Sequence, residues 1–181
     1  MTNETEENVI KTDLLDKDLG KISKQEAHKG KGILHKAIIV VVRDSGGEYL
    51  LTKRSTFKQL WPDFYDISIN THPKPDESYE TAVIRRLKEE LDLNVHNLRS
   101  IGVFSYFAEY EDKGSENEFC RIFLVENIDR REITPNPKEI SNYIFVGEGQ
   151  IREFICEGTL APWAKLIVNC GYLNLDQTPM V

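Results

Sequence analysis

The sequence predicts an α/β (α+β) sandwich in which a mixed β-sheet lies between helices. Three observations support this: a near-continuous apolar run at residues 37–42, a strongly periodic helical segment at residues 78–91, and strand-like runs that precede a C-terminal helix. The 181 residues are expected to form one domain, 9–181, after a flexible, polar tail, 1–8.

Composition and charge exclude several classes of protein. The chain is 40% hydrophobic and 29% charged, as in water-soluble globular domains. Its net charge of −7 argues against a nucleic-acid partner. No apolar run is long enough to cross a membrane, and the acidic start does not look like a signal peptide. The three cysteines have no metal-ligand spacing and fit a reduced, cytoplasmic chain.

The N-terminal half is expected to consist mostly of strands and turns. Its apolar run at 37–42 lacks alternation, which predicts a strand buried on both faces. The other expected elements are a hairpin at 9–22 with its turn at Asp18–Gly20, a basic glycine-ended loop at 24–31, a turn at 43–47, a return strand at 48–53 and a short strand at 65–70.

The helix at residues 78–91 has the clearest local pattern in the chain. Val83, Leu87 and Leu91 recur every four residues, which predicts a buried helical face. Glu77 precedes the first turn, where a carboxylate interacts favourably with the helix dipole. The elements expected after this helix are strands at 98–109, 118–125 and 143–146, a turn at 112–115, a loop at 135–137, a helix at 150–156, and a helix from Pro162 to about Cys170.

The stretch from Thr71 to Asp92 resembles a degenerate Nudix box. The box residues are matched by Thr71 for the first Gly, Glu77 for the first Glu, Arg85 for the Arg, and Glu89 with Glu90 for the final acidic pair. Arg86 stands where the box has a further Glu, and this departure resembles type I isopentenyl diphosphate isomerases. The resemblance covers the chain from about Val9 to Trp163 and implies a Nudix-like fold.

The resemblance also implies a metal site formed by three histidines and two glutamates. These ligands are His28, His35, His72, Glu116 and Glu118. The two glutamates are two residues apart, so in a strand they point to the same side. A mixed nitrogen and oxygen set suits Mn²⁺, Zn²⁺ or Fe²⁺ better than a thiolate-seeking metal, and Mn²⁺ or Zn²⁺ is the expected ion. For any one of these residues alone, a chance histidine or glutamate is the better interpretation.

A small-molecule diphosphate is the substrate class that the resemblance implies. The matching cations are Lys24, Arg54, Lys58 and Arg86, and Glu90 matches the ligand of a Mg²⁺ ion bound with the substrate. Arginine binds phosphate through two parallel hydrogen bonds, while lysine supplies a point charge. The alternative is a solvated basic face, with Arg86 and Glu90 forming an ordinary pair one helical turn apart.

The isomerase reaction needs an acid and a base on opposite faces of a double bond, and aromatic walls beside the carbocation. Glu118 and Tyr106 match one face, and Trp61 and Trp163 match the walls, although each tryptophan could equally be a core residue. On the other face, Asn70 replaces the family cysteine, and an amide does not exchange a proton near neutral pH. A nearby thiol, Cys120, follows Glu118 by one pleat and is expected on the wrong face to substitute.

Three functions are therefore open at this point. The first is an isomerase of isopentenyl diphosphate with altered or weak proton transfer. The second is a Nudix hydrolase of an isoprenoid or other organic diphosphate, in which Asn70 orients a water molecule. The third is a non-catalytic diphosphate-binding protein. The oligomeric state and the organic half of the substrate are not predicted.

Overall fold

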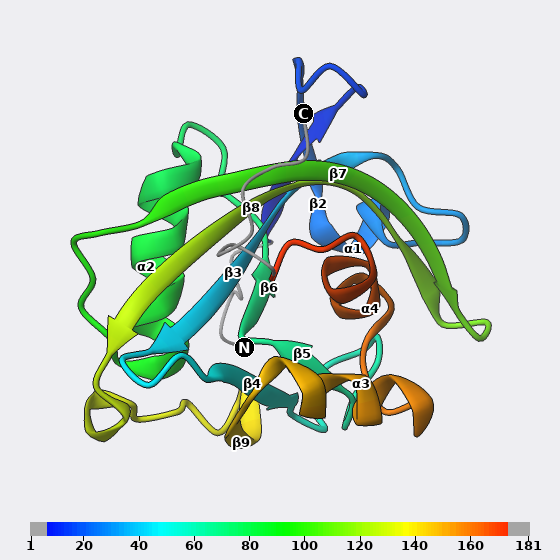
Figure 1. The fold of residues 1–181 in the computed structure, drawn as a ribbon. Helices are drawn as coiled ribbons and strands as arrows, with labels where there is room; N and C mark the ends of the chain where they lie inside the picture. Colours follow the sequence, from blue (N-terminus) through cyan, green and yellow to red (C-terminus); the bar gives the residue numbers. More distant parts are fainter. Residues whose placement is uncertain (1–6, 174–181) are drawn as a thin grey trace.

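The computed structural model describes residues 7–173, and its nine strands form one mixed sheet with helices on both faces (Figure 1). The strands are β1 (Asn8–Thr12), β2 (Asp18–Ser23), β3 (His35–Asp44), β4 (Tyr49–Arg54), β5 (Tyr65–Ile67), β6 (Ile69–Thr71), β7 (Arg99–Tyr110), β8 (Gly114–Ile128) and β9 (Ile140–Val146). The helices are α1 (Lys24–Ala27), α2 (Tyr79–Leu91), the 3₁₀ turn η1 (Arg130–Glu132), α3 (Glu148–Cys156) and α4 (Pro162–Asn169). The predicted α+β architecture is confirmed.

Strand β3 lies at the centre of the sheet because it pairs along both edges. It runs parallel to β8, with His35 opposite Glu118, and antiparallel to β6, with Ile38 opposite Thr71. Its apolar run, 37–42, is 0% exposed throughout, as expected for a strand covered on both faces. The parallel register has a functional consequence, since it places the first residue of β3 beside Glu118.

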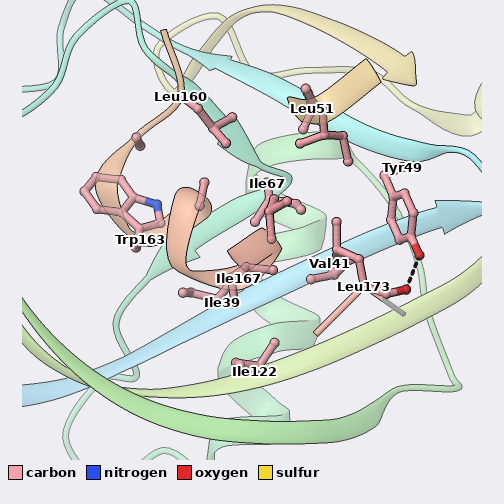
Figure 2. Close-up of a cluster of buried hydrophobic side chains, with 14 of the residues drawn as sticks. Ile39, Val41, Tyr49, Leu51, Ile67, Ile122, Leu160, Trp163, Ile167 and Leu173 are labelled. Atoms are coloured by element: carbon pink, nitrogen blue, oxygen red, sulfur yellow. Dashed lines mark hydrogen bonds between the residues drawn. The ribbon is translucent and has the colours of Figure 1, made fainter. Parts of the chain in front are cut away.

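Two apolar cores lie on opposite faces of this sheet. Helix α2 covers one face, where Val83, Leu87 and Leu91 pack with Ile38 of β3. Helices α3 and α4 cover the other (Figure 1). Figure 2 shows this second core around Trp163, which is 0% exposed. The second core also contains the side chains that line the candidate site.

Local sequence signals account for both ends of α2. Ser78 is the N-cap, and its side chain accepts a hydrogen bond from the backbone N–H of Thr81. Asp92, which stands where the Nudix box has glycine, is the C-cap in a left-handed conformation with φ of 56°. Aspartate tolerates this conformation better than most residues because its short polar side chain can bond locally. The helix therefore ends at the predicted residue without glycine.

Several predicted boundaries in the N-terminal half were wrong. The first hairpin exists, but its turn falls at residues 13–17, and Asp18–Gly20 belongs to β2. The expected loop 24–31 begins with a short helix, α1, since Ser23 caps it by accepting from the backbone of Glu26. The expected strand 65–70 is divided into β5 and β6 by Ser68, whose φ is 60°.

The second half follows the predictions more closely. Strand β8 is longer than expected and includes part of the predicted turn 112–115, so that Glu116 and Glu118 both lie within it. Residues 1–6 of the expected tail and residues 174–181 lie outside the described residues, and β1 begins at Asn8. Within residues 7–173, no helix is long and apolar enough to cross a bilayer.

Candidate functional site

The five predicted metal ligands come together from four parts of the chain. His28 is the C-cap of α1, His35 begins β3, His72 follows β6, and Glu116 and Glu118 are on β8. Each residue offers one ligand atom, and these atoms all lie within 4.8 Å of one another. The ring centroids of the three imidazoles are 4.7 to 5.2 Å apart. All five residues are buried or nearly so, so the cluster is shielded from bulk solvent.

Backbone carbonyls orient two of the three imidazoles. Nδ1 of His28 lies 2.7 Å from the carbonyl oxygen of Lys24, and Nδ1 of His35 lies 2.7 Å from that of Ile33. A carbonyl oxygen only accepts, so each Nδ1 carries the proton and donates it. In the neutral rings, Nε2 of His28 and of His35 then offers a lone pair to the cluster. Metal-binding histidines commonly donate the N–H of their other ring nitrogen to a backbone carbonyl in this way.

Glu118 is the most highly connected member of the cluster. Its Oε1 accepts a hydrogen bond from Nε2 of His72 at 2.8 Å and lies 3.6 Å from Nε2 of His35. Burial opposes ionisation, but the neighbouring imidazoles of His35 and His72 outweigh it and hold the pKa of Glu118 well below its usual value. Burial lowers the pKa of His72 well below its usual value, more strongly than Glu118 raises it. A carboxylate beside neutral imidazoles is the protonation state that metal binding requires.

The remaining pair, His28 and Glu116, also faces the cluster. Oε2 of Glu116 lies 2.8 Å from Nε2 of His28. Burial lowers the pKa of His28, but the hydrogen bond and charge of Glu116 outweigh it and raise that pKa to about 9. Among residues 7–173, Nδ1 of His72 and Oε2 of Glu116 are buried without a partner in good hydrogen-bond geometry. Concentrated negative charge, inward lone pairs and unsatisfied polar atoms fit a divalent cation with mixed nitrogen and oxygen ligands.

The predicted catalytic groups meet at the other oxygen of Glu118. Its Oε2 accepts from the hydroxyl of Tyr106 at 2.6 Å and from the thiol of Cys120 at 3.6 Å. Nδ2 of Asn70 lies 3.4 Å from the same oxygen and 3.5 Å from the Tyr106 hydroxyl. Asn70 is therefore in direct contact with the Glu118 group. Cys120 contacts the same oxygen, so it lies on the Glu118 side of the site, as expected for a residue one pleat along the same strand.

Burial and the neighbouring carboxylate keep two of these groups protonated. Burial, followed by the charge of Glu118, raises the pKa of Tyr106 well above its usual value. The same causes raise the pKa of the Cys120 thiol well above its usual value. Tyr106 therefore stays protonated and donates a short hydrogen bond to the ionised carboxylate of Glu118.

The two predicted aromatic walls are packed together in the second core. Trp61 is 4% exposed and Trp163 0%, and their ring centroids are 5.3 Å apart. The ring of Trp163 lies 5.9 Å from that of Tyr106, and its indole Nε1 donates to Asp66 at 2.8 Å. Both tryptophans therefore have the contacts of core residues, and Trp163 also lies next to Tyr106.

The predicted diphosphate cations lie among protein carboxylates. Arg86 donates to Glu90 at 2.5 Å, and both Arg86 and Lys58 form ion pairs with Glu139. Lys24, 41% exposed, pairs with Glu7 at 2.9 Å. The expected pair between Arg86 and Glu90 is thus present, and it does not by itself separate a structural role from a binding role.

Arg54 is held differently from the other three cations. It donates to the carbonyl oxygens of Leu60 and Trp61, at 2.9 and 3.0 Å, and stacks over the ring of Trp163 at 5.0 Å. Its Nη1 is also 3.5 Å from the buried carboxylate of Asp66. These contacts fix the guanidinium in one orientation and stabilise the loop that carries Trp61.

Arg85 ties the Nudix-like helix to the loop that carries His72. Its guanidinium donates two hydrogen bonds to Glu77, both at 2.7 Å, and one to Glu89 at 3.1 Å. It also reaches the carbonyl oxygen of His72 at 3.4 Å. Arg85 therefore positions the backbone of His72, which explains in physical terms why an arginine suits this place in the motif.

Two residues in the site were missed by reasoning from the sequence. Asp66 was detectable in principle, because a carboxylate inside a short apolar strand is unusual. Glu139 had no signal, since it lies in a loop more than fifty residues along the chain from Arg86. Both were found only through their contacts with Arg54, Lys58 and Arg86.

Comparison with known proteins is consistent with this geometry. The NUDIX domain family matches residues 33–163, which include β3, α2 and β8. A crystal structure of a protein from Deinococcus radiodurans has a TM-score of 0.73 at 21% identity, covering 91% of this chain and 99% of that one. The chain belongs to the NUDIX family.

Relatives in sequence narrow the class further. Isopentenyl-diphosphate Delta-isomerase 1 of Photorhabdus laumondii is 35% identical over 162 residues, covering 88% of this chain and 91% of the relative. Isopentenyl-diphosphate Delta-isomerase of Haloarcula marismortui is 30% identical over 174 residues, covering 91% and 92%. The chain is therefore a NUDIX enzyme similar to the isopentenyl-diphosphate Delta-isomerases.

Proposed function

We propose that this enzyme acts on an organic diphosphate and that His28, His35, His72, Glu116 and Glu118 hold a divalent ion, Mn²⁺ or Zn²⁺. The observation that carries the proposal is the approach of all five ligand atoms to within 4.8 Å of one another. When bound, the ion would hold Glu118 in place and stabilise its negative charge. The two backbone-oriented imidazoles support the proposal independently of any resemblance.

The diphosphate is proposed to bind at Lys24, Arg54, Lys58 and Arg86, together with Mg²⁺ at Glu90. Arg86 and Lys58 share the carboxylate of Glu139, so these two cations lie close enough to bind one diphosphate together. Burial raises the pKa of Glu90, opposed by the charge of Arg86. A cation next to Glu90 would favour its ionised form, which suits Mg²⁺.

Proton transfer is proposed to begin at the Tyr106–Glu118 pair. The 2.6 Å hydrogen bond supports a proton held between these groups. Trp163 supplies aromatic surface next to Tyr106, and Trp61 packs against Trp163, so both could stabilise a developing carbocation. Asn70 occupies the place of the thiol but has no titratable proton, so isomerisation would proceed with one of its two proton-transfer groups replaced.

The reaction is tested by incubating the Mg²⁺- and Mn²⁺-loaded protein with isopentenyl diphosphate in D₂O. Isomerisation predicts dimethylallyl diphosphate that carries deuterium, detected by NMR and mass spectrometry. Release of phosphate or pyrophosphate without deuterium incorporation would identify a hydrolase. If the metal-loaded protein forms neither dimethylallyl diphosphate nor free phosphate or pyrophosphate, it is neither an isomerase nor a hydrolase of this substrate.

The substitution Asn70→Cys restores the missing thiol and is expected to raise isomerase turnover at least about tenfold, since a positioned acid or base contributes at least this much. Asn70→Ser is the matched control, because it is small and polar but does not titrate near neutral pH. Turnover that is unchanged in Asn70→Cys, with metal content intact, would show that the pocket is built for another reaction.

Hydrolysis is the second candidate, supported by the fact that Asn70 can orient a molecule but not exchange a proton. The carboxylates of the Nudix-like helix give it less support, because Glu77, Glu89 and Glu90 all pair with Arg85 or Arg86. We further propose that residues 9–181 form a single domain and that the enzyme works in the cytoplasm, where its three free thiols would stay reduced.

A further inference from the structure

Asn70 lies on the short strand β6 and faces the group formed by Glu118, Tyr106 and Cys120. It lies on β6 opposite Ile39, and it is half-buried, whereas Glu118 and Tyr106 are buried. Asn70 is therefore the member of this group that is most open to an incoming molecule. The chemistry of its side chain decides what such a molecule must present.

The orientation of the Asn70 amide is settled by its neighbours. Oε2 of Glu118 is an acceptor that already takes hydrogen bonds from Tyr106 and Cys120. Nδ2 of Asn70 faces the same oxygen at 3.4 Å. The reverse orientation would bring the amide oxygen against a carboxylate, where two acceptors repel each other. The amide nitrogen is thus directed at Glu118, and the amide oxygen must point elsewhere.

The amide oxygen of Asn70 has no donor. Oδ1 is buried and has no hydrogen-bond partner among the described residues. A buried acceptor without a donor is unfavourable, and a ligand that supplies the donor gains the corresponding free energy. A hydrocarbon tail supplies no donor, whereas an O–H group does. A thiol at this position would make no comparable demand, because sulfur is a weak acceptor.

We propose that Asn70 makes this pocket select an organic diphosphate whose branched tail carries a hydroxyl group directed at Oδ1, in preference to the all-hydrocarbon tail. This inference rests on the proposed function, since it requires that the diphosphate end bind as described above. Asn70 acts here as a specificity-determining residue. A site built around such an acceptor rejects an analogue that lacks the donor more strongly than an apolar pocket rejects an additional methylene.

The test is a binding comparison on the full chain loaded with Mg²⁺ and Mn²⁺. Isothermal titration calorimetry is carried out with 3-hydroxy-3-methylbutyl diphosphate and with 3-methylbutyl diphosphate, which differ by one hydroxyl group. The wild type is expected to bind the hydroxylated compound at least about tenfold more tightly. In Asn70→Leu, which removes the acceptor, the preference is expected to disappear or to reverse.

Binding of inorganic pyrophosphate tests the diphosphate site separately from the preference for a hydroxyl group. If the wild type binds pyrophosphate and binds 3-methylbutyl diphosphate as tightly as the hydroxylated compound, the inference is overturned while the proposed diphosphate site stands. If none of the three compounds binds, the diphosphate site itself is wrong. The wild-type ratio decides the matter even if Asn70→Leu fails to fold, since it requires no variant.

Discussion

The two charged clusters of the site differ in how their charges are balanced. In the histidine and glutamate cluster, lone pairs and carboxylate oxygens face one another, and two buried polar atoms have no partner in good hydrogen-bond geometry within the described part of the chain. In the cation cluster, Lys58 and Arg86 are already neutralised by Glu139 and Glu90. The first arrangement could be completed by a positive ion, whereas the second is balanced by the protein itself.

Because of this difference, we expect the free energy of ligand binding to be more favourable in the histidine and glutamate cluster than in the cation cluster. A metal ion entering the first cluster satisfies groups that are otherwise unsatisfied. A diphosphate entering the second must compete with carboxylates for the same guanidinium and ammonium groups. Mg²⁺ would reduce this competition by attracting the carboxylates as well as the phosphate oxygens.

The largest expected effect is on the metal cluster. His72→Ala removes one of three imidazoles, and we expect metal affinity to fall at least about 100-fold. This is more than the usual loss when a residue that only hydrogen-bonds to a metal ligand is replaced. Metal content is measured by mass spectrometry after dialysis against a defined metal buffer. His96→Ala is the matched control because His96 is exposed and is not part of the cluster. If folded His72→Ala keeps the metal-to-protein ratio of the wild type, His72 is not a metal ligand.

A smaller effect is expected in the cation cluster, and in the opposite direction. Glu139→Gln removes the carboxylate that Lys58 and Arg86 share, so we expect pyrophosphate to bind about threefold to tenfold more tightly. Affinity is measured by calorimetry with Mg²⁺ present. Glu126→Gln is the control, since Glu126 pairs with Arg43 and Arg99 instead. Weaker binding in Glu139→Gln would mean that Glu139 holds the cations in position rather than competing for them.

The smallest effect is a pH dependence of stability at Glu139. Burial raises its pKa, but the charges of Lys58 and Arg86 outweigh this and lower the pKa from 4.5 to about 2. The carboxylate therefore stabilises the folded state fully above pH 4.5, and this stabilisation is lost as the pH falls toward about 2. Wild type and Glu139→Gln should differ by about 1 kcal/mol in the free energy of unfolding at pH 7.

Urea unfolding at pH 7 and at pH 3 measures this difference directly. The gap between wild type and Glu139→Gln should narrow at pH 3, because the carboxyl group of the unfolded chain, whose pKa is near 4.5, takes up a proton there that the folded protein does not. A gap that is equal at both pH values would show that the two ion pairs contribute nothing to stability. Glu126→Gln again serves as the comparison.

Elements with a strong local pattern were predictable from the sequence. The helix Tyr79–Leu91 was predicted from its apolar residues every four positions, and the central strand from its unbroken apolar run. The hairpin was predicted, but its turn was misplaced because Asp18 and Gly20 continue into a strand. Turn residues alone do not show where strand pairing resumes, since pairing depends on the partner strand.

The residues of the histidine and glutamate cluster were also predicted, but the ion pairs and hydrogen bonds around the other site residues were not. Nothing in the local sequence indicates that Glu139 joins Lys58 to Arg86, or that Asp66 accepts from Trp163. These pairs form between loops and strands that are distant along the chain. The same is true of Asn70, whose contact with Glu118 depends on how β6 and β8 flank β3.

The α+β class, the helix 78–91 and the set of side chains available for metal and diphosphate binding were predictable from the sequence, because periodicity and residue chemistry are local properties. Which of those charges are already neutralised, and which atom of Asn70 lacks a hydrogen-bond partner among the described residues, depend on the tertiary structure. Both depend on strand register and on the distance between segments far apart in the chain, and burial determines how strongly each charge or unsatisfied atom counts.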